Sequence, residues 1–167
     1  KAQREETPED INLSVPIIKN ILEAYHIAIL HVVGFEADDI IGTVATQAGE
    51  KGIETYMLTP DKDYGQLVRE NVYMYRPQHG GGYEKMGVEE IEQKYGISSP
   101  LQVIDLLALM GDSADNFPGC PGVGEKTAVK LINEFGSVEE LIANSAKVKG
   151  KLREKVEAAT EDIKMSK

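Results

Sequence analysis

Short runs of β-branched residues alternate with helical segments over the first 80 residues, and this alternation constrains the fold more than any other feature. Residues 27–33, 53–59 and 72–75 are apolar runs of strand length. Patterns with a helical period predict helices over residues 7–25 and 36–51. Because strands separated by helices favour a parallel sheet with crossover connections, the sequence predicts an α/β fold.

Local signals mark both of these predicted helices. Thr7 is expected to cap the first helix, with Pro8 at its first helical position. The second helix is expected to turn one apolar side towards the core. That side consists of Ile40, Ile41, Val44 and Ala48.

From residue 83 onward the sequence predicts helices only. Residues 119–124 are too rich in Gly and Pro for a helix or a strand. The helix predicted over residues 101–110 is almost wholly apolar, so we expect it to be buried. We therefore divide the chain into an α/β core over residues 1–80 and a helical subdomain over residues 81–167. The helices are expected over residues 87–95, 101–110, 125–135, 138–144 and 151–164.

Seven carboxylates fall in three tight groups, each at a junction between predicted elements. Two groups follow strands that end at the same edge of a parallel sheet, and the buried helix would deliver the third group there. Like charges this close raise one another's pKa until some protonate, so a bound cation is the usual solution. Oxygen-only ligands favour Mg²⁺ or Mn²⁺, and two such ions would suit cleavage of a phosphodiester. The seven residues are Glu36, Asp38, Asp39, Asp61, Asp63, Asp112 and Asp115.

Each acidic group taken alone also has a structural interpretation. Acids near the start of a helix stabilise it by complementing the helix dipole. Asp112 and Asp115 are three residues apart and would face the same way on a helical turn. The arrival of all three groups at junctions favours the metal interpretation.

The net charge of −10 argues against a nucleic-acid partner, but the charge is unevenly spread. Residues 1–118 carry 9 basic and 20 acidic side chains, whereas residues 119–167 carry 9 basic and 8 acidic ones. The basic cluster in residues 147–155 is either part of a nucleic-acid surface or a solvated helix face. Cys120 is the single cysteine, which suits a reducing cytoplasm, and no apolar run is long enough to span a membrane.

A glycine-rich turn precedes the helix predicted over residues 125–135. Gly122 and Gly124 would let a phosphate approach the backbone, and the N–H groups of the first helical turn would bind it. Lys126 adds a charge and Thr127 a hydroxyl. The turn suits a hairpin that grips the backbone of a duplex without reading its bases. The alternative is an ordinary turn between two helices.

Four motifs resemble, in order and spacing, those of the 5′-to-3′ exonuclease domains of bacterial DNA polymerases I, which belong to the flap endonuclease superfamily. The resemblance spans essentially the whole chain. It implies a PIN-like core, a helix–three-turn–helix over residues 119–144, and Mg²⁺-dependent cleavage of 5′ flaps, nicked DNA and RNA primers in replication and repair. The motifs are Gly34-Phe35-Glu36-Ala37-Asp38-Asp39, Thr59-Pro60-Asp61-Lys62-Asp63, Gly111-Asp112-Ser113-Ala114-Asp115-Asn116 and Pro121-Gly122-Val123-Gly124-Glu125-Lys126-Thr127-Ala128.

The resemblance also implies roles for individual residues. The seven carboxylates match the family's metal ligands. Lys1 and Arg4 match catalytic basic residues of its helical arch, which would contact the scissile phosphate. The glycine hairpin can also hold K⁺ against a DNA phosphate, and a polymerase domain is expected in the same protein. The implied DNA-binding residues are Gly122, Val123, Gly124, Lys126 and Thr127.

The chain departs from this family at its start. Family members begin with two strands that each carry an aspartate, and the sequence begins at Lys1 without them. We therefore expect a fragment that lacks a central strand and two metal ligands, and that has little nuclease activity alone. Three other functions stay open: a non-catalytic module that binds duplex DNA, a flap endonuclease without a polymerase, and a toxin-like ribonuclease of the PIN class.

Overall fold

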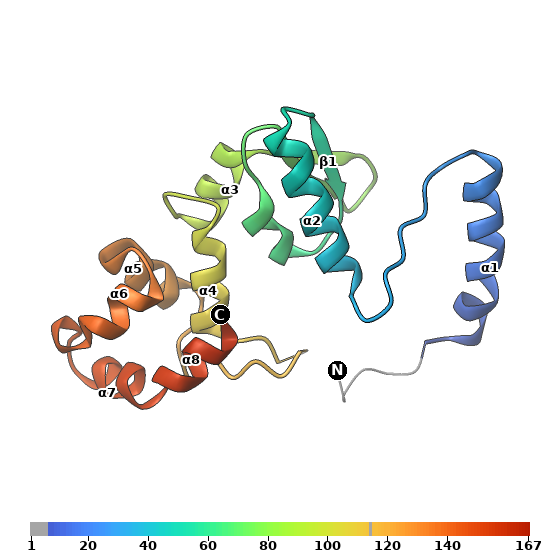
Figure 1. Cartoon of the computed structure of the whole chain (residues 1–167). Helices are drawn as coiled ribbons and strands as arrows, with labels where there is room; N and C mark the ends of the chain where they lie inside the picture. Colours follow the sequence, from blue (N-terminus) through green and yellow to red (C-terminus); the bar gives the residue numbers. More distant parts are fainter. Residues whose placement is uncertain (1–6, 114) are drawn as a thin grey trace.

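The computed structural model describes residues 7–113 and 115–167 of the chain. Lys1 and Arg4, the predicted catalytic basic residues, lie outside this part. The helix α1 (Glu9–Ala24) lies at one end of an elongated arrangement, a small sheet lies in the middle, and short helices gather at the other end (Figure 1). Within the two described ranges, no helix has the length and apolar character needed to cross a membrane.

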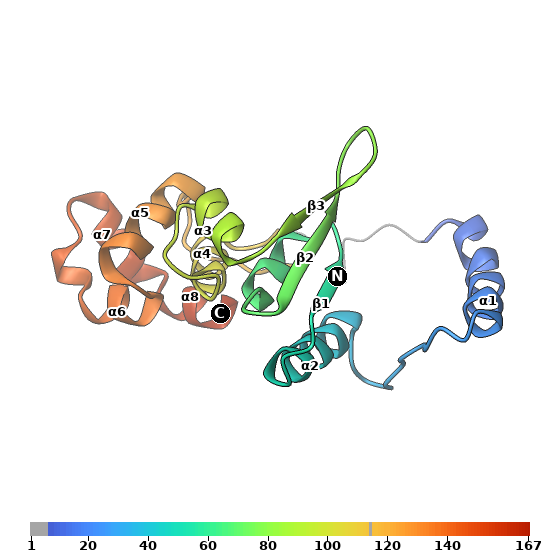
Figure 2. The same ribbon diagram turned by 90° about the horizontal axis from the view of Figure 1, so that it is seen from above.

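α1 confirms the first predicted helix but buries none of its residues. Pro8 rather than Thr7 is the N-cap residue, and no side chain caps the helix, so the predicted cap was wrong. Glu9 and Asp10 in the first turn complement the helix dipole instead. Figures 1 and 2 both show α1 standing apart from the other described elements, so little packing stabilises it.

Residues 27–33 do not form the predicted strand. They run as an irregular connection from α1 to α2 (Ala37–Glu50), and the side chains of Leu30 and Val33 are 60% and 86% exposed. A strand needs a hydrogen-bonded neighbour, and among the described residues this run pairs with no strand of the sheet. β-branched residues favour a strand, but they cannot supply the strand that pairs with it.

The sheet has three strands in the order β1-β2-β3. β1 (Thr55–Leu58) and β2 (Val72–Pro77) confirm the other two predicted strands and pair in parallel. β3 (Tyr83–Met86) pairs antiparallel with β2, so the prediction of helices only from residue 83 was wrong. Gly80, Gly81 and Gly82 all have positive φ and let the chain reverse between β2 and β3.

α2 packs on one face of this sheet, and its predicted core side is only partly confirmed. Met57, Val72 and Met74 form the buried face of β1 and β2. In α2 the buried residue is Ala45, which was not among those predicted. The four predicted residues are half-buried or exposed: Ile40, Ile41, Val44 and Ala48. α2 approaches the strands closely at Gly49, where a Cβ would lie 2.6 Å from Val72 Cγ2, which the hydrophobic pattern alone did not indicate.

The helices predicted after the sheet are confirmed, with one correction. The helix predicted over residues 151–164 is divided into α7 (Lys151–Ala158) and α8 (Thr160–Ser166). The Thr160 hydroxyl donates to the carbonyl oxygens of Val156 and Glu157, at 3.1 Å each, and so competes with the helical backbone bonds. The other elements are α3 (Val88–Tyr95), α4 (Gln102–Met110), α5 (Glu125–Phe135), α6 (Val138–Ala143) and the 3₁₀ helix η2 (Ser145–Lys147).

α4 is the buried centre of the helical part, as its composition predicted. It packs against α5, α6 and α8, and also against the 3₁₀ helix η1 (Lys62–Leu67) beside the sheet. Asp105 of α4 is 6% exposed and accepts hydrogen bonds from Val138 N at 3.0 Å and Lys167 Nζ at 2.7 Å. α4 therefore connects the helices to the sheet and directs the loop that follows it. The division of the chain at residue 80 stays a prediction.

Candidate active site

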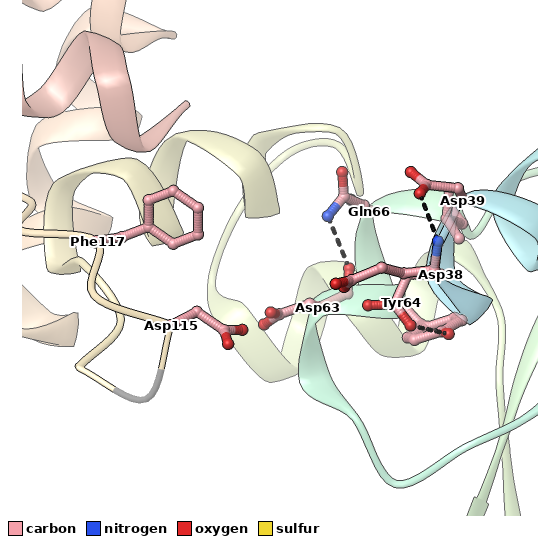
Figure 3. Close-up of a pocket in the computed structure, with 9 residues that line it drawn as sticks. Asp38, Asp39, Asp63, Tyr64, Gln66, Asp115 and Phe117 are labelled. Carbon is pink, nitrogen blue, oxygen red and sulfur yellow. Dashed lines mark hydrogen bonds between the residues drawn. The ribbon is translucent and has the colours of Figure 1, made fainter. Parts of the chain in front are cut away.

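A cavity of about 440 Å³ lies where the start of α2, the helix η1 and the loop after α4 meet (Figure 3). Five of the seven predicted carboxylates line it, and they come from all three acidic groups. Asp61 and Asp112, the other two, do not line it. The lining residues are Glu36, Asp38, Asp39, Asp63, Tyr64, Gln66, Leu67, Asp115 and Phe117.

The first acidic group is fixed by the start of α2. Glu36 is the N-cap residue, and its backbone N–H donates to Asp39 Oδ2 at 3.0 Å. The Tyr64 hydroxyl donates to Asp38 Oδ1 at 2.7 Å. Asp39 therefore has the structural role at a helix start that its position suggested, while it also lines the cavity.

The second acidic group is fixed by a turn at the carboxyl end of β1. Asp61 N donates to Thr59 Oγ1 at 3.1 Å, and Asp63 N donates to Asp61 Oδ1 at 3.0 Å. Asp61 thus caps η1, and its own carboxylate lies outside the cavity lining. The capped turn directs Asp63 into the cavity, where Gln66 Nε2 donates to the Asp63 carbonyl oxygen at 3.0 Å.

Asp63 has a carboxylate oxygen, Oδ1, that is buried and has no hydrogen-bond partner among the described residues. Burial raises the pKa of Asp63 above its usual value, the negative charges of Asp61, Asp112 and Asp115 raise it further, and Lys62 opposes this change. An orphaned carboxylate oxygen among other carboxylates fits a divalent cation, which would supply the missing partner and reverse the shift. The donor set is all oxygen, so it suits Mg²⁺ or Mn²⁺.

The third acidic group lies on a loop rather than on the predicted helical turn. Asp112 N donates to Phe117 O at 2.9 Å and Phe117 N donates to Asp112 O at 2.8 Å, which closes the loop. A Cβ on Gly111, which has φ +71°, would lie 2.5 Å from Phe117 O, so this position needs glycine. Asp115 reaches the cavity, and Figure 3 shows it pointing towards Asp63 from the opposite side. Lys62 Nζ lies 3.8 Å from Asp112 Oδ2.

The acids surround one cavity without forming a coordination sphere. In the part of the chain that the structure describes, no group of three or more His, Cys, Asp or Glu residues is arranged to hold an ion. The three groups sit on separate elements, so a small movement of the loop after α4 would change their spacing. The assignment of all seven carboxylates as metal ligands stays a prediction.

The glycine-rich turn forms as predicted and joins α4 to α5. Gly122 has φ +77°, and Gly124 is the N-cap residue of α5, with its carbonyl accepting from Thr127 N and Ala128 N at 3.0 Å each. Val123 is 4% exposed, so its side chain belongs to the core and only its backbone belongs to the turn. Lys126 is exposed on the first turn of α5. The turn therefore offers exposed backbone and the Lys126 cation to a ligand.

Sequence reasoning missed four residues that line the cavity: Tyr64, Gln66, Leu67 and Phe117. Tyr64 directly follows the second acidic group, but its partner Asp38 lies 26 residues earlier in the chain. No local pattern links these two positions. The proximity of Gln66 and Leu67 to Asp63 could have been inferred from the short turn, because a 3₁₀ helix brings residues three apart together.

Comparison with known proteins defines the family. Residues 1–96 match the N-terminal resolvase-like domain of the 5′-3′ exonuclease family, and residues 98–167 match its C-terminal SAM fold. The chain belongs to the 5′-3′ exonuclease family. This confirms the resemblance that the four motifs carry.

Two curated relatives illustrate the family. The DNA polymerase I of Bacillus subtilis (strain 168) is 42% identical over 169 residues, which cover 100% of this chain and 19% of that protein. The 5′-3′ exonuclease of Aquifex aeolicus (strain VF5) is 39% identical over 166 residues, which cover 99% of this chain and 55% of that protein. The chain therefore spans about a fifth of the first relative and about half of the second.

Solved structures confirm the flap endonuclease fold. The 5′-exonuclease of T5 with bound zinc ions has a TM-score of 0.76 and 23% identity, and the match covers 99% of this chain and 61% of that one. The bacteriophage T5 flap endonuclease, in a pseudo-enzyme–product complex with DNA and metal ions, has a TM-score of 0.79 and 22% identity, with 99% and 61% covered. At these identities the likeness establishes the fold alone.

Proposed function

We propose that this chain is part of a Mg²⁺-dependent nuclease that removes 5′ flaps and degrades nicked DNA and RNA primers from the 5′ end. The observation that carries the proposal is the buried, unpartnered Asp63 Oδ1 in a cavity lined by acids from three elements. Membership of the 5′-3′ exonuclease family supports the reaction class. A polymerase domain in the same protein is a further part of the proposal, supported by the relative in Bacillus subtilis.

The residues of the cavity would hold the cations from three sides. Asp63 offers its unpartnered oxygen from η1. The carboxylates of Glu36 and Asp38 line the same cavity from the start of α2, and that of Asp115 lines it from the loop after α4. When bound, two divalent ions would activate a water molecule and stabilise the leaving oxygen of the phosphodiester. The protein itself contributes the fixed positions of the carboxylates and excludes bulk water from Asp63.

The glycine turn would bind the duplex at a site separate from the proposed metal centre. Exposed backbone at Gly122 and Gly124 and the exposed Lys126 suit a phosphate of the DNA backbone. Such contacts fix the position of a duplex without reading its sequence. We propose that the backbone of the same turn, at Gly122, Val123 and Gly124, would hold K⁺, which would supply a positive charge for a DNA phosphate.

Replacing Asp63 tests the proposed metal centre. In the full-length protein, Asp63→Asn should lower Mg²⁺-dependent cleavage of a 5′-flap DNA by about 10²–10³-fold or more, because charge stabilisation supplies much of the catalysis. Binding of the same DNA in Ca²⁺ or chelator should persist. Asp162→Asn, at an exposed position on α8, is the matched control and should cleave normally.

Two outcomes would contradict the proposal. Near-normal cleavage by Asp63→Asn at saturating Mg²⁺ would place the metal centre elsewhere. Normal DNA binding by a wild-type protein that cleaves no flap at any Mg²⁺ concentration would favour a non-catalytic module that binds duplex DNA.

A further inference from the structure

Tyr64 connects two of the acidic groups through a single hydrogen bond. Its hydroxyl donates to Asp38 Oδ1 at 2.7 Å, which joins η1 to the first turn of α2. The residue as a whole is 6% exposed. Its side chain lies between the acidic cavity and an apolar groove bordered by α2 and β1. Figure 3 shows this contact beside Asp63.

The turn that carries Tyr64 is fixed by a capping hydrogen bond and by packing. The capping bond from Asp63 N to Asp61 Oδ1 fixes the start of η1, directly before Tyr64. The neighbouring Gly65 lies against Ile91 and Val103, so the turn packs on α3 and α4. Asp38, by contrast, is exposed, and the Tyr64 hydroxyl is the side-chain donor that its carboxylate has among the described residues. The hydroxyl of Tyr64 is therefore the group that orients Asp38.

We infer that Tyr64 is a positioning residue for the metal centre, acting through Asp38; the inference rests on the proposed function above. Its hydroxyl occupies Asp38 Oδ1, which leaves Oδ2 for a cation and favours binding through one oxygen. The same turn carries Asp63 with its buried free oxygen. Tyr64 thus sets the spacing between a carboxylate of α2 and a carboxylate of η1.

Packing alone does not account for the hydroxyl. A phenylalanine would fill the same space between the cavity and the groove without needing a hydrogen-bond acceptor. A hydrogen bond from a neutral hydroxyl to a carboxylate is short and directional, so it restricts the acceptor as well as the donor. Groups of this kind, behind the ligands themselves, orient metal-binding side chains in other proteins.

The test is Tyr64→Phe in the full-length protein, with Mn²⁺ binding measured by calorimetry in the absence of DNA. Loss of the hydroxyl should weaken Mn²⁺ binding by about tenfold or more, as removal of such a partner typically does. The Mg²⁺ concentration for half-maximal flap cleavage should rise by a similar factor, while the rate at saturating Mg²⁺ changes less. Tyr95→Phe, which removes a hydroxyl from a half-buried ring in the packing around Gly65, should leave both values unchanged.

The outcomes separate this inference from the proposed function. Unchanged Mn²⁺ affinity in Tyr64→Phe, with binding abolished in Asp63→Asn, would overturn the role of Tyr64 and leave the metal centre in place. Unchanged affinity in both variants would overturn both. Equal losses in Tyr64→Phe and Tyr95→Phe would also overturn the inference, because the effect would then come from packing.

Discussion

The helical part of the chain and residues 7–35 contain similar apolar side chains, but of these two regions only the helical part buries them. Leu109, Ile132 and Ile163 are fully buried between α4, α5 and α8. In α1, Ile17 and Ile18 are 61% and 51% exposed, and no residue of the helix is buried. Similar sequence patterns therefore produced a packed core in one region and an isolated helix in the other.

The difference shows what an amphipathic pattern contributes. It makes an element able to pack, but most helical stability in proteins comes from the packing itself. α4 has neighbours on several sides, whereas α1 stands apart and residues 27–33 stay exposed beside α2. An apolar side is therefore buried, and the helix stabilised, only where another element packs against it; the sequence pattern alone does not achieve this.

The largest expected effect comes from truncating equivalent side chains in the two regions. Leu109→Ala should lower the free energy of unfolding by about 2–5 kcal/mol, because it leaves a cavity in a closed core. Ile18→Ala should change it by less than about 0.5 kcal/mol, since an exposed side chain loses little packing. Urea unfolding of both variants measures the two values. A large loss in Ile18→Ala would mean that α1 packs on a surface in solution, and the contrast between the regions would fail.

A smaller effect on the free energy of unfolding is expected from the charge of Asp63 in the acidic cavity. The pKa of Asp63 is raised in the folded state. At pH values just above the usual pKa of an aspartate, the unfolded state therefore binds fewer protons than the folded state does. The stabilising effect of the protonated form is present at low pH and is lost as the pH rises through the folded-state pKa. Asp63→Asn should remove this dependence and stabilise the metal-free protein at pH 7 by no more than about 1 kcal/mol, because solvent screens the charges around a carboxylate that is only half-buried. Unfolding in chelator between pH 4 and 7 tests it, and an unchanged pH profile would contradict it.

The smallest effect concerns the glycine-rich turn of the helical part. Gly124→Val should lower the free energy of unfolding by no more than about 1 kcal/mol, because a Cβ at this N-cap position meets nothing within 4 Å and only the cap preference is lost. It should weaken DNA binding by obstructing the backbone. Lys126→Ala should reduce the slope of log affinity against log salt by about 1, equally for unrelated sequences. Lys19→Ala, on the exposed surface of α1, is the control. Loss for one sequence only would mean that the turn reads bases.

The sequence was sufficient for features that depend on neighbours along the chain. The helices after residue 87, the glycine turn and strands β1 and β2 all follow from local patterns of apolar residues, Gly and Pro. The identity of the acidic residues also followed from the sequence, because each group occupies a junction between local elements. Five of these seven carboxylates then proved to line one cavity.

Contacts between distant residues could not be predicted in this way. The hairpin strand β3 pairs with β2, whereas residues 27–33 have strand-like composition but pair with no strand, although the outer edge of β1 is open among the described residues. The hydrogen bond from Tyr64 to Asp38 spans 26 positions and left no periodic signal. Local propensity is a property of a few adjacent residues, but hydrogen bonds between strands and carboxylate positions in a cavity depend on which surfaces meet. Which surfaces come into contact is decided by the packing of the whole chain.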